Sequence, residues 1–208
     1  PIAALLFPEL VPGPLLALSC PLALMTGLRE FHAIEWRTAG QAIAGRVLGT
    51  ALAALCLAWL PVQTLSLLFA ALILTGVALS LKGWRVAHSG RNTTLAGMAS
   101  GLMGTITSAG APPFAIAMQH LPANRLRGTL GAVFFIGAAL SLVALAMVGR
   151  MGAPELWLSA LLMPWMVAGF VLSGRIKFLM RQQSLRPMLL GLAAFGALGI
   201  LVQTLTRH

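Results

Sequence analysis

Long apolar runs follow one another along the chain, separated by short segments that carry charge or proline. A bilayer core of about 30 Å is crossed by roughly 20 helical residues at about 1.5 Å each. The runs of about this length are Val11–Leu28, Thr38–Leu60, Val62–Leu81, Thr129–Gly149, Pro154–Ser173 and Pro187–Leu205. They predict an all-α integral membrane protein with six full transmembrane helices.

A further apolar stretch, residues 94–121, is interrupted by glycine and proline at Gly104, Gly110, Pro112 and Pro113. A continuous helix tolerates these residues poorly. The stretch therefore predicts two half-helices, Thr94–Ser108 and Pro112–Leu121, of roughly 22 Å and 15 Å, neither of which crosses the core alone. Together they form either one broken crossing helix or a hairpin that enters the membrane and returns.

The distribution of Lys and Arg decides between these two arrangements, because basic residues near the ends of spans concentrate on the cytoplasmic side. If the broken stretch crosses, the basic residues divide almost evenly between the two faces. If it returns, nearly all of them lie on one face, and only Arg150 and Arg207 lie opposite. We therefore predict a re-entrant broken-helix hairpin that opens to the cytoplasm. The predicted cytoplasmic loops are residues 29–37, 82–93, 122–128 and 174–186.

This topology also predicts an inverted repeat of hairpin plus three spans. The second repeat is residues 94–208, and because it ends on the face opposite to its start, a preceding copy is inverted. Residues 1–81 supply that first repeat, with Pro1–Leu10 as the returning half of an earlier hairpin whose entering half we expect before Pro1. Residues 82–93 join the repeats as a cytoplasmic loop. Inverted repeats with broken helices near the midplane are common in secondary transporters, where one repeat rocks against the other.

Composition supports a membrane protein and excludes a soluble globular enzyme. The chain is 59% hydrophobic and only 9% charged, whereas ordinary globular domains carry about 25% charged residues. In a polar protein, a net charge of +10 would indicate binding to nucleic acid, but here the charges lie between apolar runs. The predicted partner is thus the lipid bilayer and not nucleic acid. Cys20 and Cys56 lie far apart without a nearby histidine, so no metal site and no cofactor are predicted.

The break in residues 94–121 is the richest candidate for chemistry. Its returning half-helix begins with two prolines, which suit first helical positions. We expect the N–H groups and the positive dipole end of this half-helix to face the membrane interior, where a small anion can be held. The candidate substrate-binding residues at this break are Gly104, Thr105, Thr107, Ser108, Gly110, Ala111, Pro112, Pro113 and Gln119.

Plainer interpretations exist for the same segment. Gly97 and Gly101 form a GxxxG pattern that is typical of a helix contact, and the prolines could mark a simple kink. We favour packing for the two glycines. For the turn we favour binding, since irregular backbone at membrane depth persists only where protein or an aqueous cavity satisfies it.

Arg46 and Ser19 complete the set of candidate residues. Arg46 lies about 12 Å inside a predicted span, where an arginine costs about 3 kcal/mol. It is either a counter-charge for an anionic substrate or a side chain that snorkels to the headgroups or bonds carbonyls near Gly45 and Gly49. Ser19 either lines the pathway opposite Ser108 or bonds its own helix. The glutamates fall at loop or interface positions, so no buried carboxylate relay is predicted.

The segment MGTITSAGAPPFAIAMQ, with the basic patch and the span that follow it, resembles the second repeat of the TauE/SafE sulfite exporter family, also called TSUP. The stretch ALSCPLALMTGL and the span with Gly45 and Gly49 are similar to the first repeat, more loosely. The resemblance implies an inverted-repeat carrier of sulfite, sulfonates or other sulfur-containing anions in the inner membrane of a bacterium. The chain has Gly110-Ala111-Pro112 where the family usually has Gly-Gly-Pro, and the added methyl of Ala111 is expected to narrow the site.

The leading hypothesis is therefore a secondary transporter, and not an enzyme, that holds a small anionic substrate at two hairpin tips and exposes it alternately to each side. A membrane scaffold or subunit without transport activity is the alternative, with glycines that serve helix contacts only. Under either hypothesis the chain could form a homo-oligomer. A membrane-embedded enzyme is a weaker alternative, because no reactive pair of side chains is visible in the spans.

Overall fold

The computed structural model describes residues 10–82, 87 and 89–176. Within these residues every secondary-structure element is helical, in agreement with the all-α prediction. The elements are α2 (Gly13–Arg29), the short η2 (Phe31–Ala33), α3 (Trp36–Trp59), α4 (Val62–Lys82), α5 (Gly90–Thr107), α6 (Pro112–Ala117), α7 (Ala123–Met147) and α8 (Ala153–Ile176). The predicted span Pro187–Leu205 and residues 1–9 of the first half-hairpin lie outside the described residues.

Three of these helices are long and apolar enough to cross a membrane: residues Trp36–Trp59, Ala123–Met147 and Ala153–Ser173. They correspond to three of the predicted spans. The helix Gly13–Arg29 is apolar but shorter, at 17 residues. The structure thus supports a membrane protein, while the arrangement of six spans stays a prediction.

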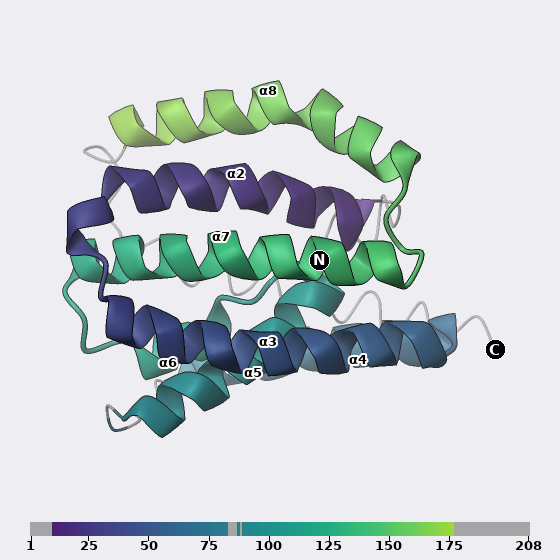
Figure 1. The fold of residues 1–208 in the computed structure, drawn as a ribbon, viewed down its shortest axis with the longest axis horizontal. Helices are drawn as coiled ribbons and strands as arrows, with labels where there is room; N and C mark the ends of the chain where they lie inside the picture. Colours follow the sequence, from purple (N-terminus) through teal and green to yellow (C-terminus); the bar gives the residue numbers. More distant parts are fainter. Residues whose placement is uncertain (1–9, 83–86, 88, 177–208) are drawn as a thin grey trace.

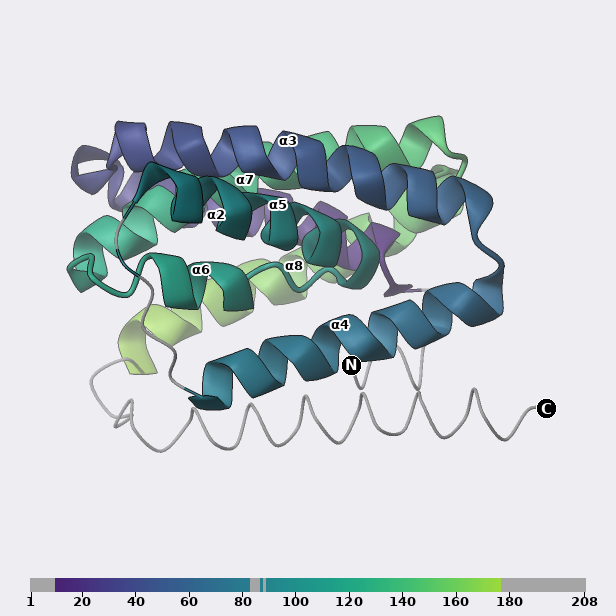
Figure 2. The ribbon, with the colours of Figure 1, turned by 90° about the horizontal axis from the view of Figure 1, so that it is seen from below.

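The long helices lie side by side in a bundle (Figure 1). Helix α2 packs between α7 and α8, and α3 packs against both α5 and α7. Helix α4 lies on the other side of α5 and α6, as the view from below shows (Figure 2). Two apolar clusters fill the bundle, one around Leu16, Leu57 and Leu145 and one around Phe114 and Val133.

The broken stretch turns back on itself where the sequence predicts a break. Helix α5 begins at a cap in which the Ser89 side chain accepts from the Asn92 N–H at 3.2 Å, and it ends before Ser108, whose φ of 57° is left-handed. After this turn α6 runs back beside α5 toward the end where α5 begins (Figure 2). Helix α6 ends at Ala117 and is shorter than the predicted Pro112–Leu121. The residues after it form turns, and Pro122 disfavours helical backbone at Leu121.

Glycines bring two pairs of helices into backbone contact. In the α3–α5 pair, a Cβ on Gly49 would overlap the Met98 carbonyl and a Cβ on Gly97 would overlap the Ala42 carbonyl. In the α2–α7 pair, a Cβ on Gly131 would lie 2.6 Å from the Cα of Gly27. The packing interpretation of the GxxxG pattern is therefore confirmed for Gly97, and Gly101 faces α3 in the same way.

Candidate functional site

A cavity of about 350 Å³ lies between α2, α3, α7 and the turn that joins α5 to α6. Of the candidate residues from the sequence, the structure brings six together in its wall: Ser19, Arg46, Gly104, Ser108, Gly110 and Ala111. Helix α7 adds Arg127 and Phe134, which the sequence analysis did not single out for binding. The wall of the cavity thus contains both the turn that was predicted to bind an anion and Arg46, which was predicted to lie inside a span.

Arg46 projects into the interior of the bundle and not toward a surface. Its relative exposure is only 2%. Its Nη1 donates to the Ser100 hydroxyl at 3.2 Å, and its guanidinium lies 5.3 Å from the centroid of the Phe134 ring, within range of a cation–π contact. A Cβ on Gly137 would overlap Nε, so the missing side chain at this position leaves room for the guanidinium. The snorkelling interpretation is not what the structure shows.

No carboxylate among the described residues neutralises this buried charge. Glu30 and Glu35 pair with Arg127 and Arg125, and Glu155 accepts from the Gly152 N–H at 2.8 Å. Within the same part of the chain, the Arg46 Nε has no hydrogen-bond partner at all. Burying a charge without a partner is costly. The cavity wall is therefore electrostatically complementary to an anion.

Ser100 connects Arg46 to the turn. Its hydroxyl accepts from Arg46 and donates to the Gly110 carbonyl at 2.6 Å. A Cβ on Gly110 would lie 2.8 Å from both Ser100 oxygens, so the turn can approach α5 this closely only with glycine there. Ser100 was not among the residues predicted from the sequence, although it lies one helical turn before Gly104 and thus on the same face of α5.

The start of α6 does not offer the N–H groups that the sequence analysis expected. Its first two positions are Pro112 and Pro113, which have no N–H. The next two N–H groups, of Phe114 and Ala115, both donate to the Ala111 carbonyl, at 3.1 and 3.2 Å. Positive charge at the cavity therefore comes from the arginines in its wall, Arg46 and Arg127, and not from the dipole of this six-residue helix.

The hydroxyls around the turn have structural partners. Ser108 Oγ donates to the Pro12 carbonyl at 2.9 Å and so ties the turn to the start of α2. Thr107 Oγ1 donates to the Met103 carbonyl and accepts from the Ala109 N–H. Ser19 lines the cavity, and its hydroxyl donates to the Leu16 carbonyl of its own helix at 2.7 Å, as the second interpretation of this residue predicts.

The remaining candidates lie away from the cavity wall. Thr105 is fully buried, and its hydroxyl lies 2.8 Å from that of Ser141 and 3.4 Å from that of Thr50. Pro113 is buried, Pro112 is half-buried and Gln119 is exposed beyond the end of α6. Among the described residues, no three His, Cys, Asp or Glu side chains form a group that could hold a metal ion.

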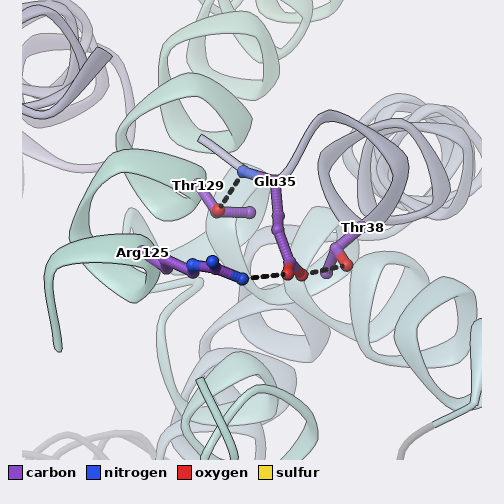
Figure 3. A network of polar contacts seen from close by, with 4 residues as sticks. All are labelled: Glu35, Thr38, Arg125 and Thr129. Carbon is purple, nitrogen blue, oxygen red and sulfur yellow. Dashed lines mark hydrogen bonds and ion pairs between the residues drawn. The ribbon is translucent and has the colours of Figure 1, made fainter. Parts of the chain in front are cut away.

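Two ion pairs join the start of α7 to the segment between α2 and α3. Arg125 Nη1 lies 3.1 Å from Glu35 Oε1, in a network that Figure 3 shows with the Thr38 hydroxyl on the same carboxylate and the Thr129 hydroxyl on the Glu35 N–H. Arg127 Nη2 lies 2.8 Å from Glu30 Oε1. Of these two arginines, Arg127 lines the cavity.

Comparisons with known proteins identify the chain at the level of a family. A family model described as "Sulfite exporter TauE/SafE" matches residues 1–200, which is nearly the whole chain. No curated protein and no solved structure matches it.

Proposed function

The chain belongs to the sulfite exporter TauE/SafE family, and on that premise we propose that it carries a small sulfur-containing anion, such as sulfite or a sulfonate, through the cavity around Arg46. Membership of the family implies a membrane transporter of sulfur-containing anions. The observation that carries the proposal for this cavity is the Arg46 guanidinium, which is buried in its wall without a carboxylate partner among the described residues.

The guanidinium suits such a substrate by its shape as well as its charge. It is planar, it stays charged, and its N–H groups can bind two oxygens of an oxyanion side by side. Nη1 donates to Ser100, Nε has no partner in the described part of the chain and lies against Gly137, and Nη2 lies next to Gly104 near the end of α5. The cavity volume of about 350 Å³ lies at the lower end of the range of about 300–1,000 Å³ for small-ligand sites.

Transport requires that the cavity be open alternately to the two sides, and the proposed inverted repeat of hairpin plus three spans provides a basis for this. In the proposed repeat, α2 corresponds to α7 and α3 corresponds to α8. In support, α2 contacts α7, and the contact of α2 with α8 has its counterpart in the contact of α7 with α3. We further propose that six spans cross the inner membrane of a bacterium, with residues 29–37, 82–93, 122–128 and 174–186 on the cytoplasmic side.

Flux into reconstituted vesicles tests the proposal. The full chain in liposomes should take up labelled sulfite or methanesulfonate with saturation, whereas the neutral analogue dimethyl sulfone should enter no faster than into empty liposomes. The control variant is Gly40→Ala, since nothing lies within 4 Å of a Cβ at this position. Equal uptake of the neutral analogue would refute charge recognition. No uptake of any anion would favour the alternative of a scaffold without transport activity.

A further inference from the structure

We infer that Arg127 is a second anion-binding residue, at the mouth of the cavity, and that the Glu30 carboxylate competes with the entering anion for it. The inference rests on the proposed function and adds to it the place where the anion is first bound. Nothing in the sequence pattern gave Arg127 this role, because its position in a basic loop indicated only which side of the membrane the loop faces.

The position of Arg127 is where the cavity meets the surface. Its side chain forms part of the cavity wall and is yet 41% exposed, while Glu30 is 22% exposed. Nε and Nη2 of Arg127 both donate to a single carboxylate oxygen, Glu30 Oε1, at 3.2 and 2.8 Å. Arg127 is therefore bound to a carboxylate, is partly exposed to solvent and belongs to the lining of the cavity.

Helix α7 places this guanidinium in line with that of Arg46. Phe134, whose ring lies against Arg46, follows Arg127 by seven positions. Residues at this spacing share one face of a helix and are separated by about 10 Å along its axis. Leu130 and Gly131 lie between them on the cavity wall. An oxyanion that enters past Arg127 thus meets one guanidinium at the mouth and a second about two helical turns further in.

The Glu30 carboxylate binds Arg127 in the same way that an oxyanion substrate would. The carboxylate and the oxyanion both present negatively charged oxygens to the same N–H groups. An ion pair as exposed as this one contributes little net stability, so an anion can displace the carboxylate readily. Glu30 would keep Arg127 oriented when no anion is bound and would release it when an anion arrives.

The neighbouring ion pair is a matched control. Arg125 and Glu35 also join the first turns of α7 to the segment before α3, at 3.1 Å, but neither lines the cavity. Thr38 and Thr129 hold Glu35 in place, so this pair has a structural function (Figure 3). Variants of the two pairs remove the same charges at the same end of the bundle, but of the four residues only Arg127 lines the cavity.

The test compares sulfite uptake by the full chain and its variants in liposomes. Arg127→Gln should raise KM about fivefold and Glu30→Gln should lower it about twofold, as expected when a charge at the rim of a site or its competitor is removed. Arg127→Lys, which keeps the charge, should stay close to the wild-type KM. Glu35→Gln and Arg125→Gln should also leave KM unchanged. Melting temperatures in detergent should change little for the Arg127 and Glu30 variants, because an exposed ion pair contributes little net stability.

The outcomes separate this inference from the proposed function. If sulfite uptake depends on Arg46 while Arg127→Gln and Glu30→Gln change KM no more than the control variants, the inference is overturned and the proposed function stands. If Glu30→Gln raises KM as Arg127→Gln does, the pair is structural and the inference is also overturned. If the wild-type chain moves no anion, both are overturned together.

Discussion

Replacement of Arg46 by methionine should weaken anion binding and leave the fold intact. Two unit charges 4 Å apart interact by about 4 kcal/mol at an effective dielectric constant near 20. Loss of anion hydration offsets part of this, so we expect a loss of about 2–3 kcal/mol, which is roughly a 30- to 150-fold rise in KM. Arg46→Lys keeps the charge but loses the planar set of donors, and it should show a smaller rise of about tenfold.

The stability of the Arg46→Met variant should not fall together with its anion binding. Arg46 is only 2% exposed and its Nε has no partner within the described residues. Replacing buried ion pairs by apolar side chains of similar volume is often neutral or stabilises a protein by about 1–4 kcal/mol, and a buried charge without an ionic partner is costlier to keep than a pair. The melting temperature of Arg46→Met in detergent should therefore be unchanged or raised.

The assay is uptake of labelled sulfite into liposomes over a range of concentrations, with equal amounts of inserted protein. Two results would refute the reasoning. A wild-type KM for Arg46→Met would show that the anion does not depend on this charge. Loss of uptake together with a lowered melting temperature would show that Arg46 holds the fold together instead.

Other substitutions test the packing and the turn. Gly49→Ala should lower the free energy of unfolding by about 1–3 kcal/mol, because its Cβ would overlap the Met98 carbonyl. The control Gly40→Ala should raise the free energy of unfolding by up to about 1 kcal/mol. Equal melting curves for the two variants would contradict the close contact of α3 and α5. Thr105→Val should cost about 1–3 kcal/mol of stability through its lost hydroxyl contacts, with KM unchanged; a rise in KM would place Thr105 at the cavity after all. Ser100→Ala should raise KM about tenfold, because Arg46 and the Gly110 carbonyl both lose a hydrogen-bond partner; a wild-type KM would show that Ser100 does not position the arginine.

The sequence predicts the positions of the long helices because apolar runs bounded by proline or charge leave few other choices. The run Val62–Leu81 corresponds to α4, Val62–Lys82, almost residue for residue. Helix α7 begins at Ala123, before the predicted Thr129, because its first two turns are largely polar and extend beyond the apolar part of the helix. An apolar window cannot detect these turns, in which Arg125 and Arg127 form their ion pairs.

The candidate site was predicted only in part, since a pattern along one helix does not show what lies across from it. The glycines and prolines of residues 104–113 mark the turn, and a lone arginine inside an apolar run marks Arg46. That these two features share a cavity depends on the packing of α3 against α5. The prediction that free N–H groups at the start of α6 face the site was wrong, because the prolines that favour a helix start also remove two of its N–H donors.

The glycine contacts described above also limit how the protein can deform. They join α2 to α7 and α3 to α5, so each pair combines one helix of the first half of the sequence with one helix of the second half. If the helices of a pair slid along each other, their carbonyl and Cα atoms would collide. The two pairs lie on either side of the cavity that contains Arg46. A rigid swing of one half of the sequence against the other would have to break both glycine contacts. If the proposed alternating access occurs, we therefore expect the α2–α7 pair to move against the α3–α5 pair, with α3–α7 contacts rearranging beside Arg46.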